Sequence, residues 1–385
     1  MVREEQQDSE MVTRRGLVVG NYCHDVLIRD GQVIGESLGG AASFVSNVLD
    51  GLSISSHYVS KVGSDFAYSV SHLPLLSGSS MTTLFHAHFF SDQDGNRHQD
   101  RVLKRIHACN PISPSDLPEL KFDFGLAVGV AGEILPETLE RMLDICSVVF
   151  VDIQALIRTF DPVDGTVKLI GLKESGFFHL LPRIGFLKTS AEEAPFVDVE
   201  EARKWCCVVV TDGKDGCRVY WKDGDLQILP FPTVQIDPTG AGDSFLGGFV
   251  AGLIQGLAVP DAALLGNFFG SLTVGQIGLP KFDLRLLQRV KDELQRRKMQ
   301  CIGCCERRAI GTEFRKSVEH EELQASLVGA AKLISTLHSQ EDQWEQQNIP
   351  TQAIEQSVHH LNNGQQKLLL YPVHEEAVQP VEGQP

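Results

Sequence analysis

Residues 237–243 read Asp-Pro-Thr-Gly-Ala-Gly-Asp, a combination of residue types that can bind and transfer a phosphoryl group. Glycines let a backbone approach a ligand closely and turn its N–H groups outward. Where a helix begins directly after such a loop, its free amides and its dipole, roughly half a positive charge, favour an anion. We therefore predict that the amides of Gly240, Ala241 and Gly242 form a cradle for a phosphoryl oxyanion, with the carboxylate of Asp243 beside it.

A carboxylate at this place is expected to stay ionised and can take a proton from a substrate hydroxyl, so Asp243 is the candidate general base. The alternative is an aspartate that only caps a helix after a glycine turn. The residues that follow favour an active site. Gly247, Gly248, Gly252 and Gly256 each cost about 1 kcal/mol relative to Ala in a helix interior. Such a helix is tolerable when it packs tightly against another backbone.

The elements on either side place this loop between a strand and a helix. Residues 226–236 are mainly apolar but contain Pro230 and Pro232, which predicts an edge or ending strand. Apolar residues recur at helical spacing between residues 245 and 257. Pro238 keeps Asp237 out of the α region, so the helix cannot begin before the glycines.

The order Asp-Pro-Thr-Gly-Ala-Gly-Asp-Ser-Phe resembles the C-terminal signature of the ribokinase-like (PfkB) carbohydrate kinases, which usually reads Asp-Thr-x-Gly-Ala-Gly-Asp. The resemblance runs from about residue 17 to about residue 287. It implies an α/β fold with a central, mostly parallel β-sheet flanked by helices, and a small β-sheet lid over the sugar. It also implies transfer of the γ-phosphoryl group of ATP, with Mg²⁺, to a hydroxyl of a small polyol.

The alternation of strand-like and helix-like segments supports this fold independently. We expect strands at residues 16–20, 125–130, 148–152, 184–188 and 206–210, and helices at 136–146, near 165–175 and near 192–196. Unbroken apolar strands in this rhythm predict a parallel sheet covered on both faces, with ligands beyond the carboxyl ends of its strands. Two hairpins near residues 26–36 and 83–104, turning at Asp30-Gly31 and Asp94-Gly95, predict the separate lid.

The first lid hairpin and the helix after it carry candidate substrate-binding residues. Asp25 matches the substrate-binding aspartate of the family, which implies a grip on vicinal hydroxyls, since a carboxylate can accept two hydrogen bonds. A turn residue that caps the hairpin is an equally good interpretation of Asp25 from the sequence alone. Asn21 lies in the same loop, Gly40 belongs to a Gly-Gly signature of the family, and Gln154 lies in a segment similar to its Asp-x-Asn…Arg.

Two residues depart from the family pattern. Phe44 stands where an Asn usually follows four places after the second glycine, and Gln154 also replaces an Asn. The run Leu-Gly-Gly-Ala-Ala-Ser-Phe-Val-Ser-Asn, with Asp-Ile-Gln-Ala-Leu-Ile-Arg, resembles the plant myo-inositol kinase branch of the family. This implies myo-inositol as acceptor, a 3-phosphate as product, and a role in phytate synthesis. The alternatives are a fructokinase, ribokinase or nucleoside kinase, and a non-catalytic family member that serves as a scaffold.

The resemblance also supplies candidate nucleotide contacts, which are Ser190, Glu193, Thr211, Gly213, Gly216 and Asn267. Residues 188–193 are similar to the family's Lys-x-Asn-x-x-Glu, whose glutamate helps hold Mg²⁺ through water, so Glu193 is the candidate metal residue. Without the resemblance we would favour the acidic first turn of a helix here. Residues 211–216 resemble the family's Thr-x-Gly-x-x-Gly nucleotide element. A P-loop motif does not occur in the sequence.

The composition limits the partners. A net charge of −16 over 385 residues argues against nucleic acid and anionic membrane surfaces, because both need clustered Lys and Arg. No apolar run is long enough to span a membrane, and the acidic N-terminus resembles neither a signal nor a transit peptide. Nine scattered cysteines indicate reduced thiols. We expect a cytoplasmic monomer or homodimer.

The ends of the chain differ from its middle. We expect residues 1–14 to be disordered, residues 15–300 to form the kinase domain, and residues 301–385 to form a C-terminal extension with a helical part and a flexible end. A zinc site at Cys301, Cys304 and Cys305 is disfavoured, because no second cysteine pair follows.

Overall fold

The computed structural model describes residues 14–89, 101–301 and 310–332. Of the segment 1–14 that we expect to be disordered, residues 1–13 lie outside the described residues, as do the turn at Asp94-Gly95, Cys304, Cys305 and the tail beyond residue 332. Within the described part of the chain, no helix combines the length and the apolar character that crossing a bilayer requires.

An eight-stranded sheet forms the centre of the fold, in the order β16-β15-β14-β13-β10-β9-β1-β4. Its parallel strands are β1 (Gly16–Val19), β4 (Ser56–Val59), β9 (Phe124–Ala127), β10 (Val149–Asp152), β13 (Phe186–Ser190) and β14 (Cys207–Thr211). An antiparallel pair, β15 (Cys217–Trp221) and β16 (Gly224–Ile228), completes one edge. The expected parallel sheet is confirmed, and the strand expected within residues 226–236 is an edge strand that ends before its two prolines.

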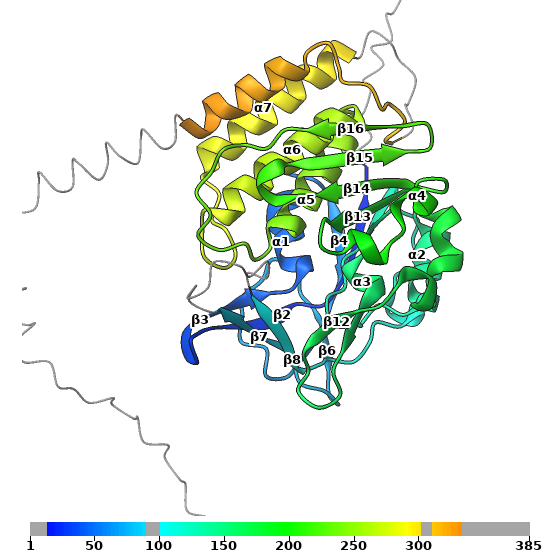
Figure 1. Cartoon of the computed structure of the whole chain (residues 1–385), viewed down its shortest axis with the longest axis vertical. Helices are drawn as coiled ribbons and strands as arrows, with labels where there is room; N and C mark the ends of the chain where they lie inside the picture. The colour runs from blue at the N-terminus through cyan, green and yellow to red at the C-terminus, as the bar shows by residue number, and fades with distance from the viewer. Residues whose placement is uncertain (1–13, 90–100, 302–309, 333–385) are drawn as a thin grey trace, which may run out of the picture. The chain divides into compact units, whose positions relative to one another are not determined.

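Helices cover both faces of this sheet (Figure 1). Strand residues that alternate in sequence point to opposite faces. On one face, Leu17, Val19 and Val151 belong to a core that includes α2 (Pro136–Ile145) and α4 (Val199–Ala202). On the other face, the ring of Phe249 in α5 meets the rings of Phe150 and Phe186. The helices on that side are α1 (Ala41–Gly51), α5 (Ala241–Ile254), α6 (Val259–Val274) and α7 (Leu284–Cys301).

Helix α5 is buried because its glycines let α1 and α6 come close. A Cβ on Gly248 would lie 2.9 Å from the carbonyl oxygen of Leu265, and one on Gly252 would lie 3.0 Å from the Cα of Ala262, both in α6. A Cβ on Gly247 would lie 2.9 Å from the Cβ of Val48 in α1. The expected tight packing is confirmed for these three residues. Gly256 is different, because it follows the end of the helix with a φ of 92° and has open space around it.

A second sheet of four strands, in the order β3-β2-β7-β8, forms the predicted lid (Figure 1). Its strands are β2 (Cys23–Arg29), β3 (Gln32–Gly39), β7 (Thr83–Phe89) and β8 (Val102–His107). Asp30 and Gly31 turn the first hairpin with φ values of 49° and 82°, as a type I′ turn requires. Because β2 and β7 pair in parallel, the two hairpins make one sheet.

The prediction of a helix near residues 165–175 is wrong. These residues contain β12 (Val167–Leu169), which pairs with β11 (Arg158–Phe160), followed by a 3₁₀ turn at Leu172–Glu174. The turn of this hairpin rests on the lid, where the amide of Arg105 donates to the carbonyl oxygen of Gly165 at 2.8 Å. Backbone pairing with distant strands therefore outweighs local helix propensity. The helix expected near residues 192–196 is a 3₁₀ turn, Ala194–Phe196, which contains Pro195.

The remaining regular elements are short. They are α3 (Gln154–Ile157), the paired strands β5 (Lys61–Gly63) and β6 (Leu75–Ser77), and the 3₁₀ turns Pro114–Asp116, Phe178–Arg183 and Gly213–Asp215.

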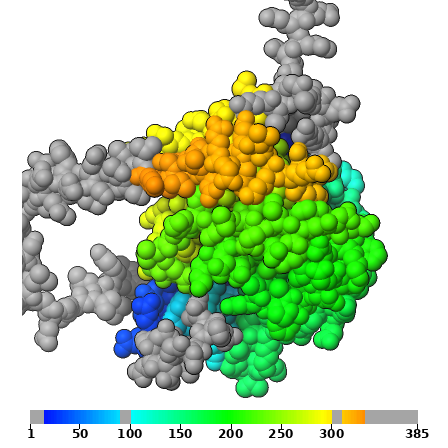
Figure 2. All heavy atoms as spheres, turned by 45° about the horizontal axis from the view of Figure 1, so that its top comes forward, coloured from blue at the N-terminus to red at the C-terminus, as the bar shows by residue number. Residues whose placement is uncertain are grey.

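Residues 310–332, in the predicted C-terminal extension, belong to the same compact unit as the sheet. In Figure 2 this orange segment lies against the yellow helices. Residues 320–332 are helical. Nδ1 of His320 forms a buried hydrogen bond with Oδ1 of Asp261 in α6, and the ring of Phe314 stacks on Trp221 at 5.2 Å between centroids. These contacts make this part of the extension a structural component of the domain.

The packing of α5 predicts that Gly248→Ala destabilises the protein by about 1–3 kcal/mol, because backbone atoms of α6 cannot move away from the added methyl group. Gly329 is the matched control, since it lies in the helix of residues 320–332 with nothing within 4 Å of a Cβ. Gly329→Ala should be neutral or stabilise by up to about 1 kcal/mol. Urea unfolding of both variants measures the difference, and equal midpoints would contradict the packing argument.

Candidate active site

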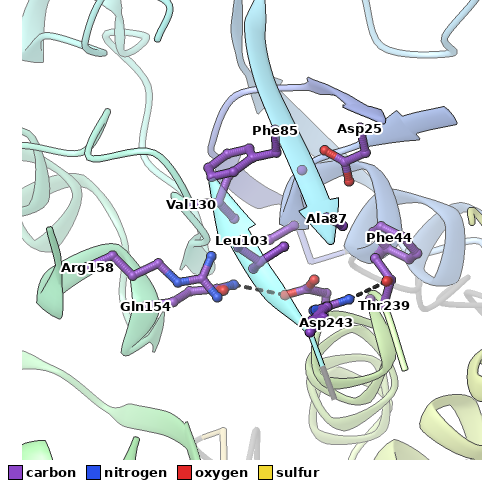
Figure 3. A pocket seen from close by; sticks show the side chains of 14 residues that line it. Asp25, Phe44, Phe85, Ala87, Leu103, Val130, Gln154, Arg158, Thr239 and Asp243 are labelled. Atoms are coloured by element: carbon purple, nitrogen blue, oxygen red, sulfur yellow. Dashed lines mark hydrogen bonds between the residues drawn. The ribbon is translucent and has the colours of Figure 1, made fainter. Parts of the chain in front are cut away.

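A pocket lies between the lid and the N-terminus of α5 (Figure 3). Its residues come from the lid, from α1, from α3 and β11, and from the loop before α5 with the first turn of that helix. They include Asp25, Gly40, Phe44, Phe85, Ala87, Arg101, Leu103, Gln154, Arg158, Thr239, Gly240 and Asp243. Residues far apart in the sequence thus meet where parallel strands end, as expected for this class of fold.

Asp25 and Asp243 point into the pocket from different elements, β2 and α5 (Figure 3). The side-chain amide of Gln154 donates to Oδ1 of Asp243 at 3.0 Å, which orients the carboxylate. Arg158 lies beside Gln154 and brings a positive charge to the same wall. The structure therefore brings together three predicted residues, Asp25, Gln154 and Asp243.

The carboxyl group of Asp25 lies over the backbone of Gly39, where a Cβ would come within 2.0 Å of Oδ2. Burial raises the pKa of Asp25 to about 7; Arg101 opposes this shift, while the carboxylates of Asp243 and Asp237 add to it. Near neutral pH this group therefore exists in both forms. It can accept hydrogen bonds from hydroxyls when ionised and donate one when protonated.

The loop before α5 is shaped by the side chain of Asp237. Its two oxygens accept hydrogen bonds from the amides of Thr239 at 2.9 Å and Gly278 at 3.2 Å. Gly240 caps the helix in the left-handed region, with a φ of 75°. Within residues 14–89, 101–301 and 310–332, no protein group accepts a hydrogen bond from the amides of Gly240, Gly242 or Asp243. The amide of Ala241 already donates to the carbonyl oxygen of Pro238, at 3.3 Å.

Phe44 forms an apolar wall next to this loop. A Cβ on Gly240 would lie 2.1 Å from the ring of Phe44, so the ring packs directly on the glycine. Phe85, Ala87 and Leu103 of the lid extend this apolar surface. A pocket with one apolar wall and several charged groups suits a carbon ring that carries hydroxyls on its edge.

Arg101, just before β8, is a pocket residue that sequence reasoning missed. Its guanidinium group donates to the hydroxyl of Thr239 in the loop before α5. Burial lowers the pKa of Arg101, and the nearby carboxylate of Asp237 opposes that shift. No motif or spacing marks this arginine in the sequence, because its partner lies 138 residues away.

Asn21 does not reach the pocket. It is fully buried, its Oδ1 accepts from the backbone amide of Lys61 at 2.7 Å, and its backbone amide donates to Glu133 at 3.0 Å. Its Nδ2 has no hydrogen-bond partner among the described residues, so the side chain is held through Lys61 alone.

The predicted nucleotide residues lie at the ends of neighbouring strands, outside the pocket of Figure 3. Ser190 ends β13 and Thr211 ends β14. Gly213 and Gly216 follow with φ values of 45° and 85°. Asn267 donates to the carbonyl oxygens of Ile228 at 3.2 Å and Leu229 at 2.9 Å. Both hydrogens of its amide are thus used to hold the chain after β16.

Glu193 is buried, and its Oε2 accepts from the amide and the hydroxyl of Ser190, both at 3.0 Å. Burial raises the pKa of Glu193, but Lys188, Arg158 and these hydrogen bonds outweigh it, so the net shift is downward. The described residues contain no group of three His, Cys, Asp or Glu side chains that could hold a metal by themselves. An ionised carboxylate near a phosphate site fits Mg²⁺, which usually binds through phosphates, waters and one or two carboxylates.

The raised pKa of Asp25 predicts how stability depends on pH. Between its ordinary value of 3.8 and about 7 the folded protein holds a proton that the unfolded chain releases, so the free energy of unfolding falls as the pH rises. Urea unfolding at about pH 5 and about pH 8 should show a smaller fall for Asp25→Asn than for the unsubstituted protein. Asp223→Asn, in an exposed turn, should show the same fall in the free energy of unfolding as the unsubstituted protein. An equal fall for all three proteins would disprove the assignment.

Residues 181–281 match the family model described as pfkB family carbohydrate kinase. The inositol 3-kinase of Arabidopsis thaliana is 65% identical over 288 residues, which cover 75% of this chain and 82% of that protein. The inositol 3-kinase of Oryza sativa subsp. japonica is 54% identical over 330 residues, which cover 83% and 82% of the two chains.

Solved structures show the same fold. A pyrophosphate-dependent kinase of the ribokinase family, complexed with a pyrophosphate analog and myo-inositol, superposes with a TM-score of 0.59 at 16% identity, covering 73% of this chain and 99% of that one. A nucleoside kinase of Methanocaldococcus jannaschii gives 0.55 at 20% identity, covering 74% and 98%. With the high identity to the two plant kinases, and with the glycine loop and lid described above, the chain belongs to the pfkB family of carbohydrate kinases.

Proposed function

We propose that this protein transfers the γ-phosphoryl group of ATP to myo-inositol, with the 3-hydroxyl as the acceptor. The observation that carries the proposal is the 65% identity, over 82% of its length, with an Arabidopsis thaliana protein named inositol 3-kinase. The pocket supports it, because charged side chains face an apolar wall around a space that a hydroxylated ring can enter.

In the proposed reaction Asp243 takes the proton of the attacking hydroxyl, and Gln154 keeps the carboxylate oriented. Asp25 binds neighbouring hydroxyls of the ring, and Gly40 and Phe44 border the acceptor. The amides at the start of α5 bind the phosphoryl group, with those of Gly240 and Gly242 making the larger contribution, since that of Ala241 already has a partner.

ATP is held beyond the ends of β13 and β14, near Ser190, Thr211, Gly213 and Gly216, with Asn267 supporting the segment around the base. Glu193 would hold Mg²⁺ through water next to the phosphates of ATP, where the ion would neutralise part of their charge.

The proposal is tested by assaying the purified chain with ATP and Mg²⁺ against myo-inositol, fructose, ribose and adenosine. We expect turnover with myo-inositol and with none of the other three acceptors. Because the 1- and 3-phosphates of myo-inositol are enantiomers, chiral chromatography against both standards should identify the product as the 3-phosphate. Faster turnover with fructose, ribose or adenosine than with myo-inositol would show that the protein has another kinase activity of the family. No turnover, together with tight binding of a protein partner, would select the scaffold. Replacing ATP by pyrophosphate tests the donor, since the likeness to a pyrophosphate-dependent kinase extends to the fold alone.

Substituting the proposed base should separate catalysis from binding. Asp243→Asn removes the proton acceptor, so turnover should fall by about 10²–10⁴ while the affinity for ATP, measured by calorimetry, changes little. Asp144→Asn serves as the control, because Asp144 forms an exposed ion pair with Arg183. Turnover of Asp243→Asn near that of the control would remove the base assignment.

We also propose a cytosolic location and a product that other kinases phosphorylate further toward phytate. The location is supported by free, buried thiols at Cys23, Cys109, Cys146, Cys206, Cys207 and Cys217, which suit a reducing compartment. We propose that the chain acts as a monomer or homodimer.

A further inference from the structure

Lys188, the third residue of β13 (Phe186–Ser190), is a cation buried beside the loop that precedes α5. Only 7% of the residue is exposed, and its Nζ lies 3.0 Å from Oδ2 of Asp152. Asp152 ends the neighbouring strand β10, is completely buried, and stands directly opposite Lys188 in the sheet. Lysine is rarely buried unless it is paired, and an ammonium group has three hydrogens to donate. The pair with Asp152 uses one of them.

The ammonium group also contacts Gly242, the second glycine of the Gly-Ala-Gly-Asp run. A Cβ on Gly242 would lie 2.8 Å from Nζ and 3.3 Å from Cε of Lys188. Gly242 is the second residue of α5 and is not among the residues with positive φ, so its backbone conformation does not demand glycine. A side chain at Gly242 would instead displace the ammonium group from its present position. This places the charge of Lys188 next to one of the amides that has no acceptor in the protein.

The charges around this point explain why a cation is needed there. The carboxylates that act on Lys188 are those of Asp152, Glu193 and Asp243. Burial lowers the pKa of Lys188, but these three groups outweigh it and the net shift is upward, so the side chain stays protonated. A phosphoryl group that enters the same space carries further negative charge. The amides of α5 supply roughly half a positive charge, which is less than one of these carboxylates removes.

We propose that Lys188 is a catalytic residue that binds the phosphoryl group during its transfer, and that Asp152 is a positioning residue that holds the ammonium group in place. This inference rests on the proposed kinase reaction. In that step the bond from the γ-phosphorus to the leaving oxygen of ADP breaks and a bond to the inositol oxygen forms. The hydroxyl proton goes to Asp243. Lys188 keeps its proton and donates hydrogen bonds to the oxygens on which charge accumulates.

The test replaces the buried pair without leaving a lone charge, by combining Lys188→Met with Asp152→Asn. Turnover should fall by about 10²–10³, the loss typical of one transition-state donor, while the KM for myo-inositol stays within a few-fold. Calorimetry with ADP alone should give an unchanged affinity. With ADP, aluminium fluoride and myo-inositol, which together imitate the transferring phosphoryl group, the affinity should fall by a factor similar to that in turnover. A purely structural role would not separate these two affinities.

Two further variants control the experiment. Lys173→Met with Asp198→Asn replaces an exposed lysine–aspartate pair. It should leave turnover, the KM for myo-inositol and the two affinities unchanged. Gly242→Ala adds a methyl group where the ammonium group lies, and the flexible end of Lys188 can move, so the protein should fold normally but turn over slowly. In a Lys188→Ala, Asp152→Asn background the same methyl group should have little further effect, because the two changes act through one contact.

Two results would overturn the role of Lys188. One is unchanged turnover by the Lys188→Met, Asp152→Asn variant. The other is an equal loss of affinity for ADP and for the aluminium fluoride complex in that variant. Full additivity of Gly242→Ala would show that the glycine serves the ligand and not the lysine. These results are distinct from a failure of the proposed function. If the unsubstituted protein ignores myo-inositol but phosphorylates another acceptor, the same comparison is made with that acceptor.

Discussion

Compensation of negative charge is the constraint on which this site depends. Five carboxyl groups lie around the start of α5, where we propose that phosphate binds. They belong to Asp25, Asp152, Glu193, Asp237 and Asp243. Burial raises the pKa of Asp25 to about 7 and that of Asp152 to about 6, and the neighbouring carboxylates add to both shifts. Three cations, Arg101, Arg158 and Lys188, and the exposed amides of α5 balance the charge. Each cation reaches the site from a different element, so the site exists only when the lid, the sheet and α5 are assembled.

The glycines of α5 fix the position of the helix whose first amides contribute to this charge balance. Gly248 and Gly252 let the backbone of α6 approach within van der Waals distance, which immobilises a helix that would be a poor helix former alone. A fixed helix presents its first amides in a fixed direction, and electrostatic stabilisation of a transition state needs such preorganised groups. The packing of α5 against α6 therefore fixes the direction of the amides at the start of α5.

The lid supplies one wall of the pocket. Its inner face contributes Asp25 with its carboxyl group and Phe85, Ala87 and Leu103 with apolar surface, while Phe44 closes the space next to Gly240. The pocket therefore combines charged and apolar surface, as the proposed binding of a cyclic polyol requires. The hairpin β11–β12 supports the lid from outside through the contact between Arg105 and Gly165.

The sequence by itself predicted the parallel strands, the loop before α5 and the burial of that helix, because apolar runs and glycine spacing are local patterns. The resemblance to the ribokinase-like family, and not these patterns, implied that Asp25 and Gln154 belong with Asp243. Only the tertiary structure showed that Arg101 lines the pocket, that Lys188 pairs with Asp152 next to Gly242, and that Asn21 lies outside the pocket. It also showed that the side-chain amide of Asn267 already has acceptors and that residues 167–169 form a strand. Arg101 and Thr239 are 138 residues apart, and Lys188 and Asp152 are 36 residues apart. Side-chain contacts over such separations depend on the exact register of the sheet and the position of the lid, which no local pattern encodes.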